Sequence, residues 1–164
     1  MRGLIFKLAG GAAVLIAALI YAFEKNKAEL RRIKKCRAVI GFIGECKLQI
    51  GCFSLPVRDI LDGYADRWEG GAAFIAEAEK TDVGEAARRH SRFLLDGAEE
   101  RELFTAFASE LGRGYKGAET ARCDEYLEKF KKLTADLEAD AASKGRVRIA
   151  VSACISVMAV LFFA

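Results

Sequence analysis

Hydrophobic residues gather at the two ends of the chain, and charged residues lie between them. Residues 4–23 are apolar except for Lys7, residues 149–164 carry no charge, and every acidic residue lies between Glu24 and Asp140. A helix of 20 residues is about 30 Å long, which matches the hydrocarbon thickness of a bilayer. The pattern predicts transmembrane helices at 1–23 and 149–164 on either side of an α-helical domain at 24–148.

Each apolar end has an alternative interpretation. The first could be a secretory signal, but Tyr21-Ala22-Phe23 lacks the pair of small residues that cleavage requires, so we favour an uncleaved anchor. The second could be a buried core helix. Its 16 uncharged residues reach only about 24 Å, so Arg146 and Arg148 would have to extend toward the headgroups for it to span a bilayer.

The sequence of residues 24–148 predicts an all-α domain. Pro56 is its one proline, and no stretch alternates with the two-residue period of a strand. A first long helix over about 25–51 is predicted by apolar residues at helical spacing, namely Leu30, Ile33, Ile40, Ile43 and Ile50. We expect Cys36, Cys46 and Cys123 to be small core residues.

Short helices should follow the first long one. Ser54 ahead of Leu55-Pro56 indicates a helix start, with an inner face made of Ile60, Leu61, Tyr64 and Trp68. A helix over 72–79 is expected after Gly70-Gly71, and Trp68 and Phe74 should be core residues. The next helix should begin at Thr81 or Asp82, with an apolar face that includes Ala86, Phe93 and Leu94.

Two further boundaries are predicted by capping signals. Asp96 and Glu99 have the spacing of a capping box for a helix through Leu111, which Gly112 would end in a left-handed conformation. The last helix should be long, because apolar residues recur at three- and four-residue steps at Cys123, Leu127, Phe130, Leu133 or Thr134, Leu137 and Ala141.

The first and last long helices are expected to form an antiparallel pair that continues toward the membrane. Only Gly145 interrupts the last helix on the way to the second apolar segment. Small residues at four-residue spacing could let the two spans approach closely, with Ala9, Ala13 and Ala17 on one and Ser152 and Ser156 on the other.

Charge predicts the orientation of these spans. Seven basic residues lie between Lys25 and Arg37, against a single acidic one, Glu29. Basic residues beside a span resist translocation, so the middle domain should be cytoplasmic. The residues expected at the membrane surface are Lys25, Lys27, Arg31, Arg32, Lys34, Lys35, Arg146 and Arg148. The same run would also suit an ordinary solvated helix face.

The charge balance and the cysteines restrict the classes of partner and of metal site that we expect. Between Glu24 and Arg148, 24 basic residues nearly balance 23 acidic ones, which argues against nucleic acid as the main partner. Five cysteines without a CxxC pair indicate a reducing compartment rather than a disulfide framework. A zinc site would need Cys46, Cys52 and His90 to converge, and no ligand spacing supports it.

The sequence offers little catalytic chemistry. It has no phosphate-binding glycine loop, no metal-binding histidine pair, and only His90 as a partner for a cysteine nucleophile. We therefore expect a protein that is not an enzyme and has no cofactor, metal or small-molecule substrate. Arg88, Arg89 and Arg92, with His90 among them, could bind an acidic partner, although such runs are more often solvated faces. Glu99, Glu100 and Glu102 suit a helix N-terminus without any acid–base role.

The outline of the chain resembles the stage III sporulation protein AB family. The features that carry the resemblance are the N-terminal anchor, the basic helix, the Leu-Pro turn within residues 54–61, the Phe107 to Leu111-Gly112 helix end, the long charged helix and the C-terminal anchor. The resemblance covers nearly the full length. The family typically has Asp and Gln where this chain has Tyr115 and Glu119.

This resemblance implies a bacterial membrane protein of the sporulation mother cell, on the outer forespore membrane. Such proteins belong to the channel complex between mother cell and forespore, and their cytoplasmic domain is similar to the platform-protein domains of type II secretion and type IV pilus machines. The implied partners are the lipid bilayer, an assembly ATPase and ring-forming components. No catalytic residue is carried over. The alternatives are a membrane-tethered thiol enzyme or redox sensor using Cys46, Cys52 or Cys123, and a platform adaptor outside sporulation.

Overall fold

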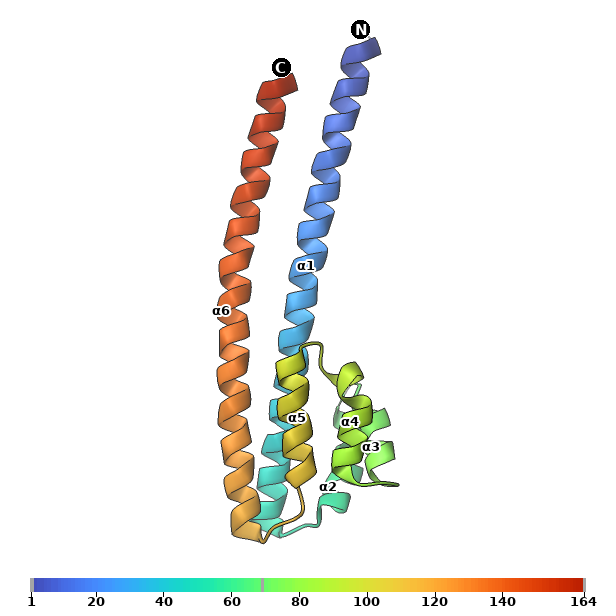
Figure 1. The fold of residues 1–164 in the computed structure, drawn as a ribbon, viewed down its shortest axis with the longest axis vertical. Helices are drawn as coiled ribbons and strands as arrows, with labels where there is room; N and C mark the ends of the chain where they lie inside the picture. The colour runs from blue at the N-terminus through green and yellow to red at the C-terminus, as the bar shows by residue number, and fades with distance from the viewer. Residues whose placement is uncertain (1, 69, 164) are drawn as a thin grey trace. The chain divides into compact units, whose positions relative to one another are not determined.

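The structure is a computed structural model that describes the backbone of residues 2–68 and 70–163. Side chains are described except at residues 2–15, 18, 66, 146, 148–149, 152–153, 156–157 and 159–163. All regular secondary structure in this part of the chain is helical, which confirms the all-α fold class. The chain divides into two units, one made of Met1–Arg31 and Leu137–Ala164 and the other of Arg32–Asp136 (Figure 1).

The first unit holds the outer parts of the two longest helices, α1 (Arg2–Leu48) and α6 (Lys116–Phe163). Helix α6 continues through Gly145 without a break. The predicted small-residue ridges fall mainly on Ala9, Ala13, Ser152 and Ser156, whose side chains lie outside the described residues. Among the residues that are described, no helix combines the length and the apolar character that crossing a membrane requires.

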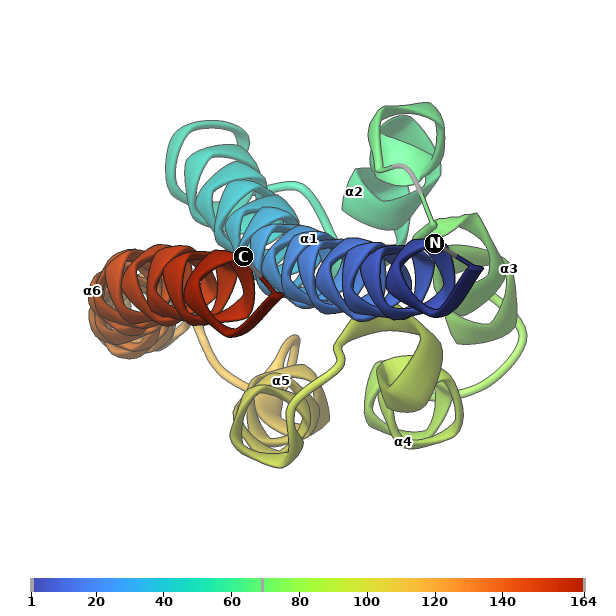
Figure 2. The same ribbon diagram turned by 90° about the horizontal axis from the view of Figure 1, so that it is seen from above.

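The second unit, residues 32–136, is called the helical domain below. It contains the end of α1, a π-helix (Gln49–Phe53), α2 (Val57–Tyr64), a 3₁₀ turn (Ala65–Arg67), α3 (Ala72–Ala78), α4 (Val83–Leu94), α5 (Ala98–Glu110) and the start of α6. Seen along its long helices, these elements form a ring in chain order, and α6 closes the ring beside the end of α1 (Figure 2).

An aromatic cluster fills the centre of this ring. The Phe42 ring stacks on Trp68 with centroids 4.9 Å apart and meets Phe74 and Phe107 edge-on at 6.2 and 6.4 Å. Trp68 is 5% exposed, and Phe42 and Phe74 are fully buried. The expectation that Trp68 and Phe74 belong to the core is confirmed. Since edge-on and offset ring pairs add to ordinary apolar burial, this cluster ties α1, α3 and α5 together.

Helices α1 and α6 run antiparallel within the helical domain, as the sequence predicts. Lys47 Nζ lies 2.6 Å from Asp124 Oδ1, and a Cβ atom at Gly51 would lie 3.3 Å from the Thr120 methyl group. Residue numbers therefore decrease along α6 as they increase along the first long helix and the π-helix that follows it. Burial follows the predicted stripes at Ile33, Ile43, Ile50, Leu127 and Phe130, and Cys36, Cys46 and Cys123 are fully buried as expected. Leu30, however, is 57% exposed.

Local capping signals give both correct and incorrect boundaries. The Asp82 carboxylate accepts from the Gly84 amide as the N-cap of α4, and Gly112 has a φ of +82° after α5, as predicted. The start of α2 is wrong, because Ser54 adopts a left-handed conformation that ends the π-helix, and Pro56 is the residue before α2. The capping box at Asp96 is also wrong by one residue, because the N-cap of α5 is Gly97.

Candidate partner-binding surface

Helix α4 carries the arginines that sequence reasoning singles out. Small residues on its inner side, Gly84, Ala86, Ala87 and Ser91, are buried. A Cβ atom at Gly84 would lie 2.8 Å from the Cα atom of Ser109, so α4 packs against the backbone of α5 at this point. This close approach fixes which side of α4 faces solvent.

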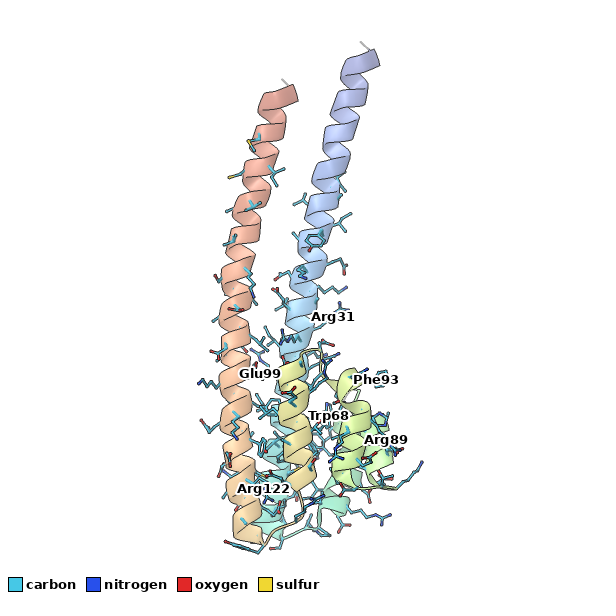
Figure 3. All side chains as sticks on the ribbon, viewed as in Figure 1. Arg31, Trp68, Arg89, Phe93, Glu99 and Arg122 are labelled. Carbon is cyan, nitrogen blue, oxygen red and sulfur yellow. The ribbon has the colours of Figure 1, made fainter. Side chains whose placement is uncertain are left out.

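We call Arg88, Arg89, Arg92 and Phe93 the α4 surface. At about 100° per residue these four side chains share one continuous exposed arc of the helix. Phe93 is 77% exposed, an unusual environment for a large aromatic side chain, and its ring lies 6.4 Å from that of His90. Figure 3 shows Arg89 and Phe93 on α4. The prediction that Phe93 belongs to the apolar inner face is wrong.

The three arginines differ in how they are held. Arg89 lies 2.7 Å from Glu77 of α3 and 3.2 Å from Glu85, so it links α4 to α3. Arg88 meets Glu85 only at 3.5 Å and its side chain is 62% exposed. Arg92 is exposed and makes no ion pair among the described residues. Of the three arginines on the α4 surface, Arg88 and Arg92 are therefore the two that an acidic partner could reach most easily.

The predicted membrane-surface residues divide into two groups. Lys25, Lys27 and Arg31 lie on α1 with exposed side chains. Arg32 and Lys35 instead make ion pairs inside the helical domain, with Glu100 and Asp96 at 2.5 and 2.6 Å. Lys34 is exposed, and the side chains of Arg146 and Arg148 lie outside the described residues.

Glu100 is a buried charged residue whose structural role the sequence does not indicate. Its side chain is 0% exposed, and its Oε1 accepts from the Arg32 Nε, a hydrogen bond that raises the pKa of the arginine. Its Oε2 has no hydrogen-bond partner. A Cβ atom at Gly97 would collide with that carboxylate and with the Arg32 guanidinium, so glycine is needed for the pair to form.

Comparison with known protein families identifies the family of this chain. The sequence profile of stage III sporulation protein AB (spore_III_AB) matches residues 7–164. The chain belongs to the stage III sporulation protein AB family. No curated protein and no solved structure matches the chain.

Glu119 has a clear structural role in this family member. Glu119 is 3% exposed, and its two carboxylate oxygens accept from the Gly112 and Gly114 amides at 3.1 and 2.6 Å. Arg122 Nη1 lies 2.7 Å from Oε1. Burial acts against the charge of Arg122, but the hydrogen bonds and charges of Glu119 and Glu110 together outweigh it and raise the pKa of the guanidinium. Glu119 thus holds the α5–α6 turn, whereas Tyr115 is 79% exposed.

The cysteines of this family member are mostly shielded. Cys36, Cys46 and Cys123 are buried and free, and Cys52 is exposed. Burial raises the pKa of Cys36 to about 12 and that of Cys123 to about 11, and it raises the pKa of Cys46 well above its usual value. Cys46, Cys52 and His90 do not form a metal site, because no group of three His, Cys, Asp or Glu side chains among the described residues could hold a metal ion.

Proposed function

We propose that this protein is a non-enzymatic, membrane-anchored assembly platform of the channel complex between mother cell and forespore. The observation that carries the proposal is the family match over residues 7–164, which covers both apolar ends and the helical domain together. In this role the protein would bind an assembly ATPase in the cytoplasm and place ring-forming components at the outer forespore membrane.

The anchoring part of the proposal rests on the sequence and on the two long helices. The apolar segments 4–23 and 149–164 lie almost wholly within α1 and α6. The exposed cations Lys25, Lys27 and Arg31 follow the first segment closely, where they can contact anionic headgroups. This charge pattern supports a helical domain on the cytoplasmic side of the bilayer.

The docking part of the proposal rests on the α4 surface. Arg88 and Arg92 offer exposed positive charge, and Phe93 offers a large apolar contact beside them. Arginine and aromatic side chains are the residue types that most often dominate binding energy at protein interfaces. We therefore expect the ATPase to present an acidic patch with a small apolar pocket to this surface.

The thiol-enzyme alternative has weaker support. A nucleophilic or redox-sensing cysteine works as a thiolate and needs a lowered pKa, whereas burial raises the pKa of Cys46 and Cys123. Cys52 is free and exposed. These environments favour a structural role for the buried thiols.

Capture of the ATPase by the full-length protein in nanodiscs tests the docking proposal. The variant Arg88→Glu/Arg92→Glu should lower capture at least tenfold, and Phe93→Ala should lower it as well. The matched control is Arg58→Glu/Lys80→Glu, which reverses two exposed cations elsewhere on the helical domain and should leave capture unchanged. Equal capture by the wild type and the α4 variants would show that the ATPase does not use this surface.

A further inference from the structure

A groove of about 580 Å³ lies between α5 and α6 of the helical domain, on residues that the proposed function does not use. Its apolar lining comes from Leu103, Ala106, Tyr126 and Leu133. Its remaining lining is charged and comes from Glu99, Glu102, Lys129, Lys132 and Asp136. The acidic pair Glu99 and Glu102 lies on α5, whereas Lys129, Lys132 and Asp136 lie on α6. The α5 edge of the groove is therefore acidic, and the α6 edge carries two lysines and one carboxylate.

The acidic and basic residues stand at matching levels across the groove. Arg122 lies 3.1 Å from Glu110, and the Tyr126 ring lies 5.4 Å from that of Phe107, so α5 and α6 are antiparallel with a fixed register. Counting along both helices from these contacts puts Glu102 level with Lys129 and Glu99 level with Lys132, to within about 3 Å.

These opposite charges do not neutralise each other within one copy. Among the described residues, Glu99, Glu102 and Lys132 make no ion pair, and Lys129 pairs at 2.6 Å with Glu125 on its own helix. The groove therefore presents an unpaired acidic edge and a partly free basic edge to solvent, with an apolar strip between them.

We propose that this groove binds the same groove of a second copy of the chain. In a twofold dimer each surface meets itself. If the twofold axis runs along the helices, the α5 edge of one copy faces the α6 edge of the other, and Glu99 and Glu102 meet Lys132 and Lys129 twice. A twofold axis across the helices would bring acidic edges together, which is unfavourable. The charges of the two edges therefore favour a twofold axis along the helices, and the matching levels let Glu99 and Glu102 of one copy reach Lys132 and Lys129 of the other.

This arrangement also fits chains anchored in one bilayer, a point that rests on the proposed function. Because α1 and α6 are antiparallel, both leave the helical domain at the same end. A twofold axis along the helices keeps this end on the same side in both copies. Confinement to a membrane raises the effective concentration of each copy, so a modest interface is enough to pair them.

Charge reversal of each edge tests the dimer. Two differently tagged full-length chains are expressed together and purified from membranes in detergent, and the fraction of one that co-purifies with the other is measured. Wild-type chains should co-purify. Glu99→Lys/Glu102→Lys alone and Lys129→Glu/Lys132→Glu alone should each lose at least tenfold of this signal, because like charges then face each other. Expressing the two variants together should restore it, because opposite charges face each other again.

A matched control tests whether the loss of co-purification is specific to the residues of the groove. Glu128→Lys/Lys131→Glu exchanges an ion pair of α6 that does not line the groove and should leave co-purification unchanged. The proposal is overturned if wild-type chains do not co-purify, if the single-edge variants still do, or if the mixed pair does not recover. Cross-linking of the groove to a different protein, without self-association, would also overturn it. Since the α4 surface shares no residue with the groove, loss of ATPase capture alone would leave the dimer intact.

Discussion

The Arg32 Nε lies 2.5 Å from Oε1 of Glu100, a residue 68 positions further along the chain. The contact joins the start of the helical domain on α1 to the first turn of α5. Because the Glu100 side chain is fully buried while the Arg32 side chain is 36% exposed, the arginine brings a partly solvated positive charge to a carboxylate that the protein encloses. We expect this pair to fix the position of α5 against α1.

Removing Arg32 should destabilise the helical domain. Arg32→Ala leaves a buried carboxylate without its cation, and we expect a loss of about 2–3 kcal/mol in the free energy of unfolding, below the range for fully enclosed pairs because Arg32 is partly solvated. Trp68 is the only tryptophan and lies in the core, so its fluorescence in a urea titration of the full-length protein reports this unfolding.

Arg31→Ala is the matched control for this prediction. Arg31 is the neighbouring residue, with an exposed side chain, and its loss should change the free energy of unfolding by less than about 0.5 kcal/mol. Leucine at both positions 32 and 100 should recover most of the stability, since no charge is then buried. Equal stability of Arg31→Ala and Arg32→Ala would contradict a structural role for the pair.

Two glycine substitutions should have opposite effects. Gly84→Ala would place a methyl group 2.8 Å from the Ser109 backbone, and we expect a loss of about 1–3 kcal/mol in spite of the better helix propensity of alanine. Gly44→Ala meets no atom within 4 Å and should add about 0.5–1 kcal/mol. Urea midpoints by Trp68 fluorescence distinguish them, and a stabilised Gly84→Ala would mean that α4 and α5 are not packed this closely.

The turn between α5 and α6 should depend on Glu119. Glu119→Ala removes the acceptor for two backbone amides and should cost about 1–3 kcal/mol, whereas Glu119→Gln keeps one carbonyl oxygen and should cost less. The exposed Glu128, which pairs at 3.3 Å with Lys131, provides the control, and its alanine variant should change stability by less than about 0.5 kcal/mol. A similar loss at both positions would argue against this capping role.

The buried cysteines should make the helical domain sensitive to alkali. In the folded protein the pKa of Cys123 is about 11, so the unfolded chain loses its thiol proton at a lower pH than the folded chain. This contribution to stability is complete below about pH 9 and is lost as the pH rises toward 11, on the order of 2–3 kcal/mol. Cys123→Ala should have a flatter stability profile in this window.

Burial also raises the pKa values of Tyr64 and Tyr126, so the difference between the wild type and Cys123→Ala, rather than either profile alone, measures the share of the thiol. The same burial predicts that iodoacetamide at pH 8 labels Cys52 and leaves Cys36, Cys46 and Cys123 unmodified, as peptide mass mapping would show. Rapid labelling of Cys46 or Cys123 in the folded protein would reopen the thiol-enzyme alternative.

The sequence predicts the parts of this fold that depend on neighbouring residues. Helical spacing identifies α1 and α6. Asp82 correctly marks the start of α4 and Gly112 the end of α5, because each acts within one turn of its own position. Ser54 fails as a boundary because its side chain instead accepts from Lys116 of α6, a contact that local sequence does not encode.

The exposed α4 surface is harder to predict, because it also depends on contacts between distant residues. Phe93 shares its spacing with the buried Ala86, so periodicity alone assigns it to the core. The structure turns it outward because small residues, Gly84, Ala87 and Ser91, fill the closely packed side of α4. Arg32 and Glu100 likewise look like surface charges until the fold brings them together across 68 positions.

The central claim is that the α4 surface of an anchored platform serves sporulation. The most direct measurement deletes the gene in its host, restores it with the wild type or with Arg88→Glu/Arg92→Glu, and counts heat-resistant spores at equal membrane levels of the protein. We predict that the deletion blocks development after engulfment, that the wild type restores spores, and that the variant does not. Full spore formation by the variant, or by the deletion strain, would contradict the account.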